Sequence, residues 1–225
     1  MATVTAAQVK SLRERTGAGM NDCRMALLES EGAEDKAVEI IQKKGLAKAA
    51  KKAGAIAAEG RVISYIHAGS RVGVLAEINC QTDFTARSDE FVKFCDEVAL
   101  QIASSSPLYV KREDVPSADK DKQLDIFRGQ LVEEENKTGK KRPEAATAKI
   151  LEGKLDKWLS EICLNEQELV TREEKVTVSS AADGLAAKIG EKIGVRRFVR
   201  FELGEGIEKK VVDFAAEVAA AVAAS

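Results

Sequence analysis

The chain of 225 residues has 35 basic and 37 acidic side chains, so its formal net charge is only −2. This balance argues against a protein whose whole surface attracts nucleic acid or another polyanion. The apolar fraction of 44% is ordinary for a soluble protein, and no apolar run approaches the ~20 residues that a membrane-spanning helix needs. The first ten residues resemble neither a signal nor a transit segment, which favours a cytoplasmic protein, or a stromal one if the gene belongs to a plastid.

The first 45 residues are predicted to form a module of three short helices. Thr5 and Gln8 make a capping-box pattern at the first helix, and Asn21 or Asp22 is expected to cap the second. The third helix is predicted to stop near Gly45. Three short helices bury little apolar surface, so we expect this module to be marginally stable on its own.

The turn at Met20 and Asn21 has two interpretations. In the first, it is a tight connection between helices, with Met20 in the core. In the second, Met20 is an exposed, polarizable side chain on a surface suited to a partner helix. The pattern alone favours neither.

Residues 46–60 are rich in Ala and Lys and are interpreted as a partly helical linker. A basic cluster at its start consists of Lys43, Lys44, Lys48, Lys51 and Lys52. These lysines indicate either a solvated face or a phosphate contact. Because no aromatic residues are interleaved to stack on bases, we favour the solvated face and expect no direct binding of nucleic acid.

The stretch from Val72 to Cys80 alternates apolar and mixed residues and is predicted to be a half-buried strand. Arg61–His67 is expected to pair with it as a hairpin. A helix is predicted to begin after Ser88, a favourable N-cap, and to run to about Ser104. The apolar face of this helix would be Phe91, Phe94, Cys95, Val98 and Ile102.

Between this strand and helix lies a polar connector, residues 81–87, that contains Phe84. Phe84 either folds back onto the next helix as a hydrophobic staple or points outward to anchor a partner. The general preference for burying aromatic rings favours the staple.

The second half of the chain is predicted to add helices and one strand. Residues 117–141 are charged with a narrow apolar stripe, typical of an exposed helix or of one that packs on a single neighbour or a second copy. A helix after Pro143 has a wide apolar face and is expected to cover a sheet. We also expect a strand at Val176–Val178, a helix capped near Ser180 that reaches Ile193, a strand at Val195–Leu203 and an apolar helix at Val211–Ala224.

Candidates for chemistry are scarce. The four cysteines, Cys23, Cys80, Cys95 and Cys163, form no Cys-x-x-Cys pair and each lies in an apolar pattern, so we expect buried thiols and no metal site. The single histidine, His67, has no nucleophile or carboxylate partner in the pattern. We see no catalytic pair and no cofactor fingerprint, and expect a protein without enzymatic activity or cofactors.

Three stretches together carry a family resemblance: Arg13–Leu27, Leu75–Phe91 (LAEINCQTDFTARSDEF) and Ile150–Gln167. In order and content they resemble the elongation factor Ts family, the guanine-nucleotide exchange factors of bacterial-type translation. The resemblance implies an α+β fold with a UBA-like three-helix module (residues 1–45), a linker (46–60), a sheet core covered by helices that serves dimerisation (61–203) and a C-terminal module (204–225).

The resemblance also implies a partner and site residues. The partner would be the GTPase domain of elongation factor Tu, whose Mg²⁺ site would be disturbed by an outward turn of Thr82, Asp83, Phe84 and Thr85. Arg13, Met20 and Asn21 would contact the same domain. Because the chain has only one copy of the central hairpin, we expect a homodimer, as in similar short members. The alternative is a non-enzymatic adaptor that binds helical or ubiquitin-like partners through its first module.

Overall fold

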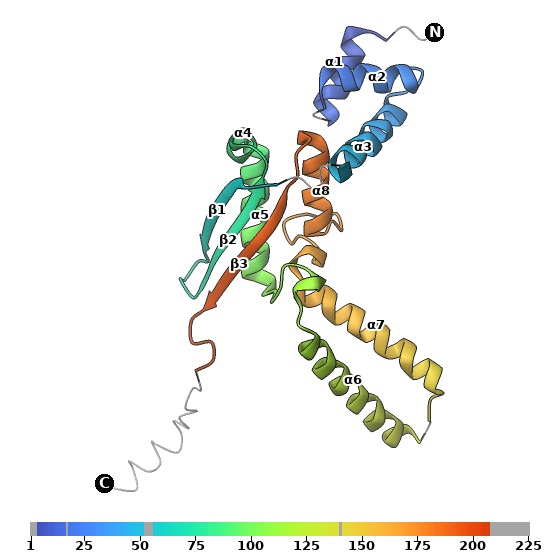
Figure 1. Cartoon of the computed structure of the whole chain (residues 1–225), viewed down its shortest axis with the longest axis vertical. Helices are drawn as coiled ribbons and strands as arrows, with labels where there is room; N and C mark the ends of the chain where they lie inside the picture. Colours follow the sequence, from blue (N-terminus) through green and yellow to red (C-terminus); the bar gives the residue numbers. More distant parts are fainter. Residues whose placement is uncertain (1–3, 17, 52–55, 140, 208–225) are drawn as a thin grey trace, which may run out of the picture.

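The structure is a computed structural model, and it describes residues 4–16, 18–51, 56–139 and 141–207 (Figure 1). Its elements confirm the α+β class. In chain order they are α1 (Ala6–Thr16), α2 (Met20–Glu29), α3 (Glu34–Lys51), β1 (Glu59–Ile66), β2 (Val72–Cys80), α4 (Asp83–Arg87), α5 (Asp89–Ser105), η1 (Arg112–Asp114), α6 (Ser117–Thr138), α7 (Glu144–Ile162), η2 (Leu164–Glu166), α8 (Val178–Ile189) and β3 (Gly194–Glu202).

Helices α1, α2 and α3 pack around a small core of their own, which includes Leu12, Cys23 and Leu27. The predicted capping box is present, since the Thr5 N–H donates to Gln8 Oε1 at 3.0 Å and the Gln8 N–H donates to Thr5 Oγ1 at 3.3 Å. The predicted cap of α2 is wrong. Gly19 is the N-cap and helix α2 begins at Met20, so that Asn21 lies in its first turn.

Helix α3 continues past Gly45 to Lys51, which corrects the expected stop at that glycine. Gly45 is buried and lies against Ala187 of α8. The Ala- and Lys-rich sequence that follows has a high helix propensity, so the helix has no local reason to end there. Glycine serves here as a point of close approach between two helices.

The sheet is antiparallel with the order β1-β2-β3, so β2 is the central strand. Its even-numbered residues, Val74 to Cys80, point into the core, while the odd-numbered ones lie on the opposite face. Helix α5 covers the inner face of the sheet, and α8 packs against α5 (Figure 1). The predicted hairpin, the predicted third strand and the predicted start of α5 are confirmed, and Ser88 Oγ accepts a hydrogen bond from the Phe91 N–H at 3.4 Å. The five residues of the predicted apolar face of α5 are all buried.

Helices α6 and α7 form an antiparallel hairpin that projects from the body of the protein (Figure 1). The predicted start of α7 after Pro143 is confirmed, but the expectation that this helix covers a sheet is wrong. Its apolar residues pack against α6 and against the base of the hairpin, where Leu159 and Cys163 form a small cluster with Val115. Helix α6 therefore packs on a single neighbour, which is one of the arrangements that its narrow apolar stripe predicted.

Residues 168–178 and the end of α8 differ from the prediction. The expected strand at Val176–Val178 is reduced to a single bridge between Glu168 and Thr177. Helix α8 begins at Val178 with Thr177 as its N-cap and ends before Gly190, whose φ of 82° is the left-handed conformation favoured at a helix C-terminus. It therefore does not reach Ile193.

The predicted C-terminal helix lies outside the described residues. Within the described ranges, no helix has the length and apolarity needed to cross a membrane.

Candidate functional site

The connector after β2 is an ordered helical turn. Thr82 caps the short helix α4, because its Oγ1 accepts a hydrogen bond from the Thr85 N–H at 3.3 Å. Ser88, the N-cap of α5, also donates a hydrogen bond from its Oγ to the Thr85 carbonyl at 2.8 Å. Thr85 and Ala86 are buried beneath the turn. Local hydrogen bonds and burial thus fix the backbone that carries Phe84.

Phe84 points away from the body, and 83% of its surface is exposed to solvent. The staple that general burial preferences favoured is therefore absent, and the outward orientation implied by the family resemblance is present. Beside it, Asp83 forms an ion pair with Arg87, with 3.1 Å between Oδ2 and Nη2. A large aromatic side chain held outward on a rigid turn is an arrangement suited to anchoring another macromolecule.

One residue of this site escaped the sequence analysis. Glu191, which follows α8, accepts hydrogen bonds from Gln81 and Thr82 across more than 100 residues of chain. Burial acts to raise the pKa of Glu191, but the hydrogen bonds from the Thr82 hydroxyl and from the Gln81 and Thr82 N–H groups outweigh burial and hold the pKa below its ordinary value. No signal near Glu191 in the sequence indicates this contact.

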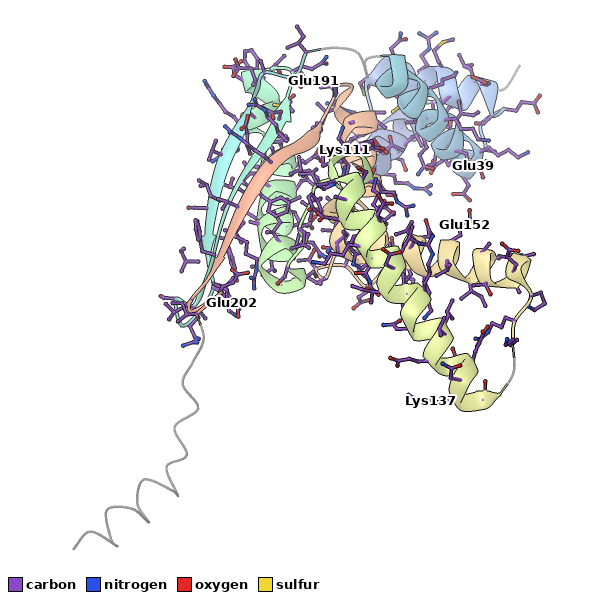
Figure 2. The ribbon with its side chains drawn as sticks, turned by 60° about the horizontal axis from the view of Figure 1, so that its bottom comes forward. Glu39, Lys111, Lys137, Glu152, Glu191 and Glu202 are labelled. Atoms are coloured by element: carbon purple, nitrogen blue, oxygen red, sulfur yellow. The ribbon has the colours of Figure 1, made fainter. Side chains whose placement is uncertain are left out.

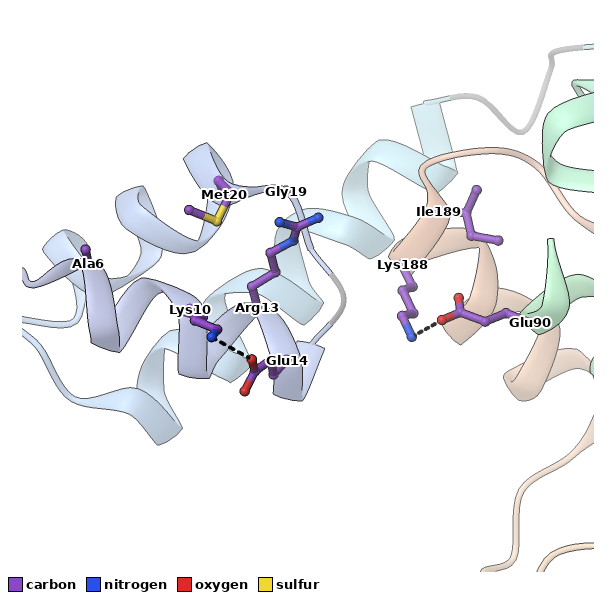
Figure 3. Close-up of a pocket in the computed structure, with 9 residues that line it drawn as sticks. All are labelled: Ala6, Lys10, Arg13, Glu14, Gly19, Met20, Glu90, Lys188 and Ile189. Carbon is purple, nitrogen blue, oxygen red and sulfur yellow. Dashed lines mark hydrogen bonds and ion pairs between the residues drawn. The ribbon is translucent and has the colours of Figure 1, made fainter.

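Arg13 and Met20 line an open cleft of about 900 Å³ between the three-helix module and the end of α8 (Figure 3). Met20 is 50% exposed, which agrees with its interpretation as a surface side chain and not with a place in the core. Asn21 is exposed but lines a neighbouring hollow together with Arg24. The structure therefore brings Arg13 and Met20 to one cleft and places Asn21 next to it.

The far wall of this cleft is formed by the end of α8 and the start of α5. Lys188 of α8 forms an ion pair with Glu90 at the start of α5 (Figure 3). Glu90 lies six positions after Phe84 in the sequence. The last turn of α8 therefore lines the cleft and also contacts the start of α5, the helix that follows the turn.

Other candidate groups lie apart from this site. The His67 Nδ1 lies 3.0 Å from the Tyr65 hydroxyl, a local contact at the hairpin end. Of the basic cluster, Lys43 and Lys44 pair with Glu39 and Glu29. Across the part of the chain that the structure describes, no group of three or more metal-binding side chains comes together.

Comparison with known proteins gives one family. The family model described as "Elongation factor TS" matches residues 2–205 of this chain. The chain is similar to a protein named "Elongation factor Ts" from Carboxydothermus hydrogenoformans, with 53% identity over 97% of this chain and 98% of that protein. Relatives of the same name from Desulforamulus reducens (52% identity over the whole of both chains) and Geobacter sulfurreducens (51% identity over 97% and 98%) match it in the same way.

Proposed function

The chain belongs to the elongation factor Ts family, and on this premise we propose that it is a guanine-nucleotide exchange factor for elongation factor Tu. Membership gives it a role in translation elongation. The proposal adds the reaction that it promotes, the release of GDP from the partner GTPase, and its place of action, the cytoplasm. The exposed and rigidly held Phe84 is the observation that carries the proposal.

Phe84 would act on the Mg²⁺ and phosphate site of the partner. Mg²⁺ requires near-ideal octahedral coordination, so a small displacement of the groups around it weakens its binding sharply. In this proposal the Phe84 ring inserts between elements of the GTPase domain, and Asp83 exchanges its exposed pairing with Arg87 for a backbone N–H of the partner. The chain makes and breaks no covalent bond, so it acts without being an enzyme.

Thermodynamic linkage sets the direction of this effect. The factor lowers the affinity of the partner for GDP by the same ratio as GDP lowers the affinity of the partner for the factor. The nucleotide-free GTPase should therefore bind this chain most tightly, and GDP or GTP should expel it.

The cleft beside the three-helix module would provide a second contact with the same GTPase domain. Met20 offers a flexible apolar surface, and Arg13 has no ion-pair partner among the described residues. A helix of the partner with an apolar side chain and a carboxylate on one face would match this pair.

The outer face of the sheet supports the predicted homodimer. It is apolar and exposed along its centre, with Val62, Ile66, Leu75, Val199 and Phe201 between 40% and 69% exposed. These residues share one face, because Val62 and Ile66 of β1 and Val199 and Phe201 of β3 lie in register with the odd-numbered residues of β2. A second copy related by a twofold axis would bury this face sheet against sheet, which makes the core the dimerisation domain.

Release of fluorescent GDP from elongation factor Tu tests the proposal in stopped flow. Wild-type protein should accelerate release, and Phe84→Ala should slow the stimulated rate about 30-fold, because truncation of an anchor costs at least ~2 kcal/mol of binding. Leu108→Ala, also at an exposed apolar residue but far from the turn, is the matched control and should leave the rate unchanged. Equal rates with wild type and Phe84→Ala would reject the role of the ring.

A further inference from the structure

We infer that Glu191 is the positioning residue that sets the direction in which the turn of residues 81–85 presents Phe84. This inference rests on the proposed exchange function and adds to it a residue that touches neither nucleotide nor metal. Glu191 would act through the backbone of the turn, and its contribution would be visible only while Phe84 is present.

The carboxylate of Glu191 binds the first two residues of the turn at three points. The N–H groups of Gln81 and Thr82 each donate to Oε2 at 3.1 Å. The Thr82 hydroxyl donates to Oε1 at 2.7 Å. Hydrogen bonds to an ionised acceptor are stronger than neutral ones, and three that converge on one carboxylate restrict both the position and the rotation of the peptide that they hold.

The position of Glu191 is itself determined by the fold. Gly190 ends α8 in the left-handed conformation, so the next residue turns away from the helix axis toward β2. Figure 2 shows Glu191 at the beginning of the segment that leads into β3, beside the upper end of the sheet. Three positions earlier, Lys188 pairs with Glu90 of α5. The end of α8 is therefore fastened to the regions before and after the turn.

The other contacts of the turn hold its far end rather than its first peptide, since Thr85 and Ala86 are buried and Arg61 Nη1 donates to the Ala86 carbonyl at 3.4 Å. The bond from the Thr85 N–H to Thr82 Oγ1 is internal to the turn, so it preserves the helical shape but not its direction. The Cys80 thiol donates to the Thr82 carbonyl at 3.1 Å, a weak hydrogen bond from the strand that enters the turn. Without Glu191, the peptide of Gln81 and Thr82 loses its contacts with the α8–β3 connection, and the start of the turn, from which Phe84 projects, is less restricted.

The test combines substitutions at Glu191 with Phe84→Ala in a double-mutant cycle on GDP release from elongation factor Tu. Glu191→Ala should lower the stimulated rate at saturating factor about tenfold, the scale of losing charge-assisted hydrogen bonds that orient a group. In the Phe84→Ala background it should lower the rate no further, because the two residues act through one contact. Glu191→Gln retains an acceptor for the backbone N–H groups and should fall between wild type and Glu191→Ala.

Hydrogen–deuterium exchange supplies a readout that does not depend on the partner. In Glu191→Ala the amides of Gln81 and Thr82 should exchange faster, while the amides of the central strand β2 should not. Glu202→Ala removes a glutamate side chain at the opposite end of β3 from Glu191 and is the matched control (Figure 2). It should leave both the release rate and the two amides unchanged.

The outcomes separate the inference from the proposed function. Wild-type protein that fails to accelerate GDP release overturns the exchange function and the inference with it. Active wild-type protein together with a Glu191→Ala variant of full activity overturns the inference alone. A rate loss of equal size with and without Phe84 also overturns it, since Glu191 would then support the fold in general.

Discussion

Gly45 of α3 crosses Ala187 of α8 so closely that a Cβ on Gly45 would stand 2.9 Å from the Ala187 Cβ and 3.0 Å from the Ala187 carbonyl oxygen. The packing of α3 on α8 is the main contact between the three-helix module and the rest of the protein (Figure 1). The position of the cleft that contains Arg13 and Met20, relative to Phe84, therefore depends on the absence of a side chain at residue 45.

Gly45→Ala should displace the module from α8 without unfolding it. Alanine favours a helix over glycine by about 1 kcal/mol, but one of the atoms in the way belongs to the backbone and cannot rotate aside. We expect weaker binding of nucleotide-free elongation factor Tu, measured by calorimetry, and no gain in thermal stability.

Gly129→Ala is the matched control for this substitution. Gly129 also lies inside a helix, α6, and a Cβ there would meet nothing within 4 Å. That variant should be stabilised by about 0.5–1 kcal/mol and should bind normally. Stabilisation of the Gly45 variant to the same extent, with normal binding, would contradict the packing argument.

Gly45 also shows where sequence reasoning stops. A glycine after an amphipathic stretch is the usual sign of a helix end, and a glycine required by a neighbouring helix looks the same in the sequence. Only knowledge of Ala187, more than 140 positions away, distinguishes the two. The contact of Glu191 with Thr82 was missed for the same reason, since it joins residues 109 positions apart.

Periodic elements were predicted well, because their signal is local. The alternation in β2 identified Val74, Ala76, Ile78 and Cys80 as buried, and the five residues predicted for the apolar face of α5 are all buried. For α7, the wide apolar face indicated that something covers the helix but not what, and the cover is α6. Phe84 is the opposite case, since general burial preference favoured a buried ring and only the family resemblance indicated an exposed one.

Introduction of a charge on the outer face of the sheet should abolish the proposed dimer. Val199 lies opposite Leu75 at the centre of this face. Val199→Lys would bury an unpaired charge between two sheets, so we expect a monomer in light scattering coupled to gel filtration. Val132→Lys, at an exposed apolar residue of α6, is the control and should keep the mass of wild type. A dimer that persists in Val199→Lys would place the interface elsewhere.

Loss of Arg112 should loosen the helical hairpin at its base. The Arg112 guanidinium pairs with both carboxylate oxygens of Glu166 and with Asp156 of α7, and these partners raise its pKa above the ordinary value. Arg112→Met leaves two carboxylates without their common partner. Because the site is partly exposed, we expect a cost on the order of 1 kcal/mol.

This cost should be confined to the hairpin. Amides of α6 and α7 should exchange faster with deuterium in Arg112→Met, while those of β2 should keep the rates of wild type. Arg128→Met removes only a surface pair with Asp125 within α6 and should change neither set. Faster exchange throughout the sheet would show that Arg112 supports the whole fold.

Alkaline pH should destabilise the protein through its buried thiols. All four cysteines are buried and free. Burial raises the pKa of Cys95 to about 12 and that of Cys163 to about 11, from an ordinary value of 9.0. Above pH 9 the unfolded chain releases thiol protons that the folded protein keeps, so the free energy of unfolding falls as pH rises from the unfolded pKa toward the folded one. For Cys95 alone the loss should reach roughly 1–2 kcal/mol by about pH 10.5.

Cys95→Ala isolates this contribution from the lysines and tyrosines that titrate in the same range. Denaturant unfolding of both proteins near pH 8 and near pH 10.5 should show a smaller loss of stability in the variant, although the variant starts from a lower value because of the cavity. In the folded protein near pH 8, a disulfide reagent should react with Cys95 and Cys163 no faster than the protein opens, because the thiolate is the reactive form and burial suppresses it. An equal alkaline loss in wild type and variant would mean that Cys95 ionises as easily in the folded protein as in the unfolded chain, and would contradict the raised pKa that its burial predicts.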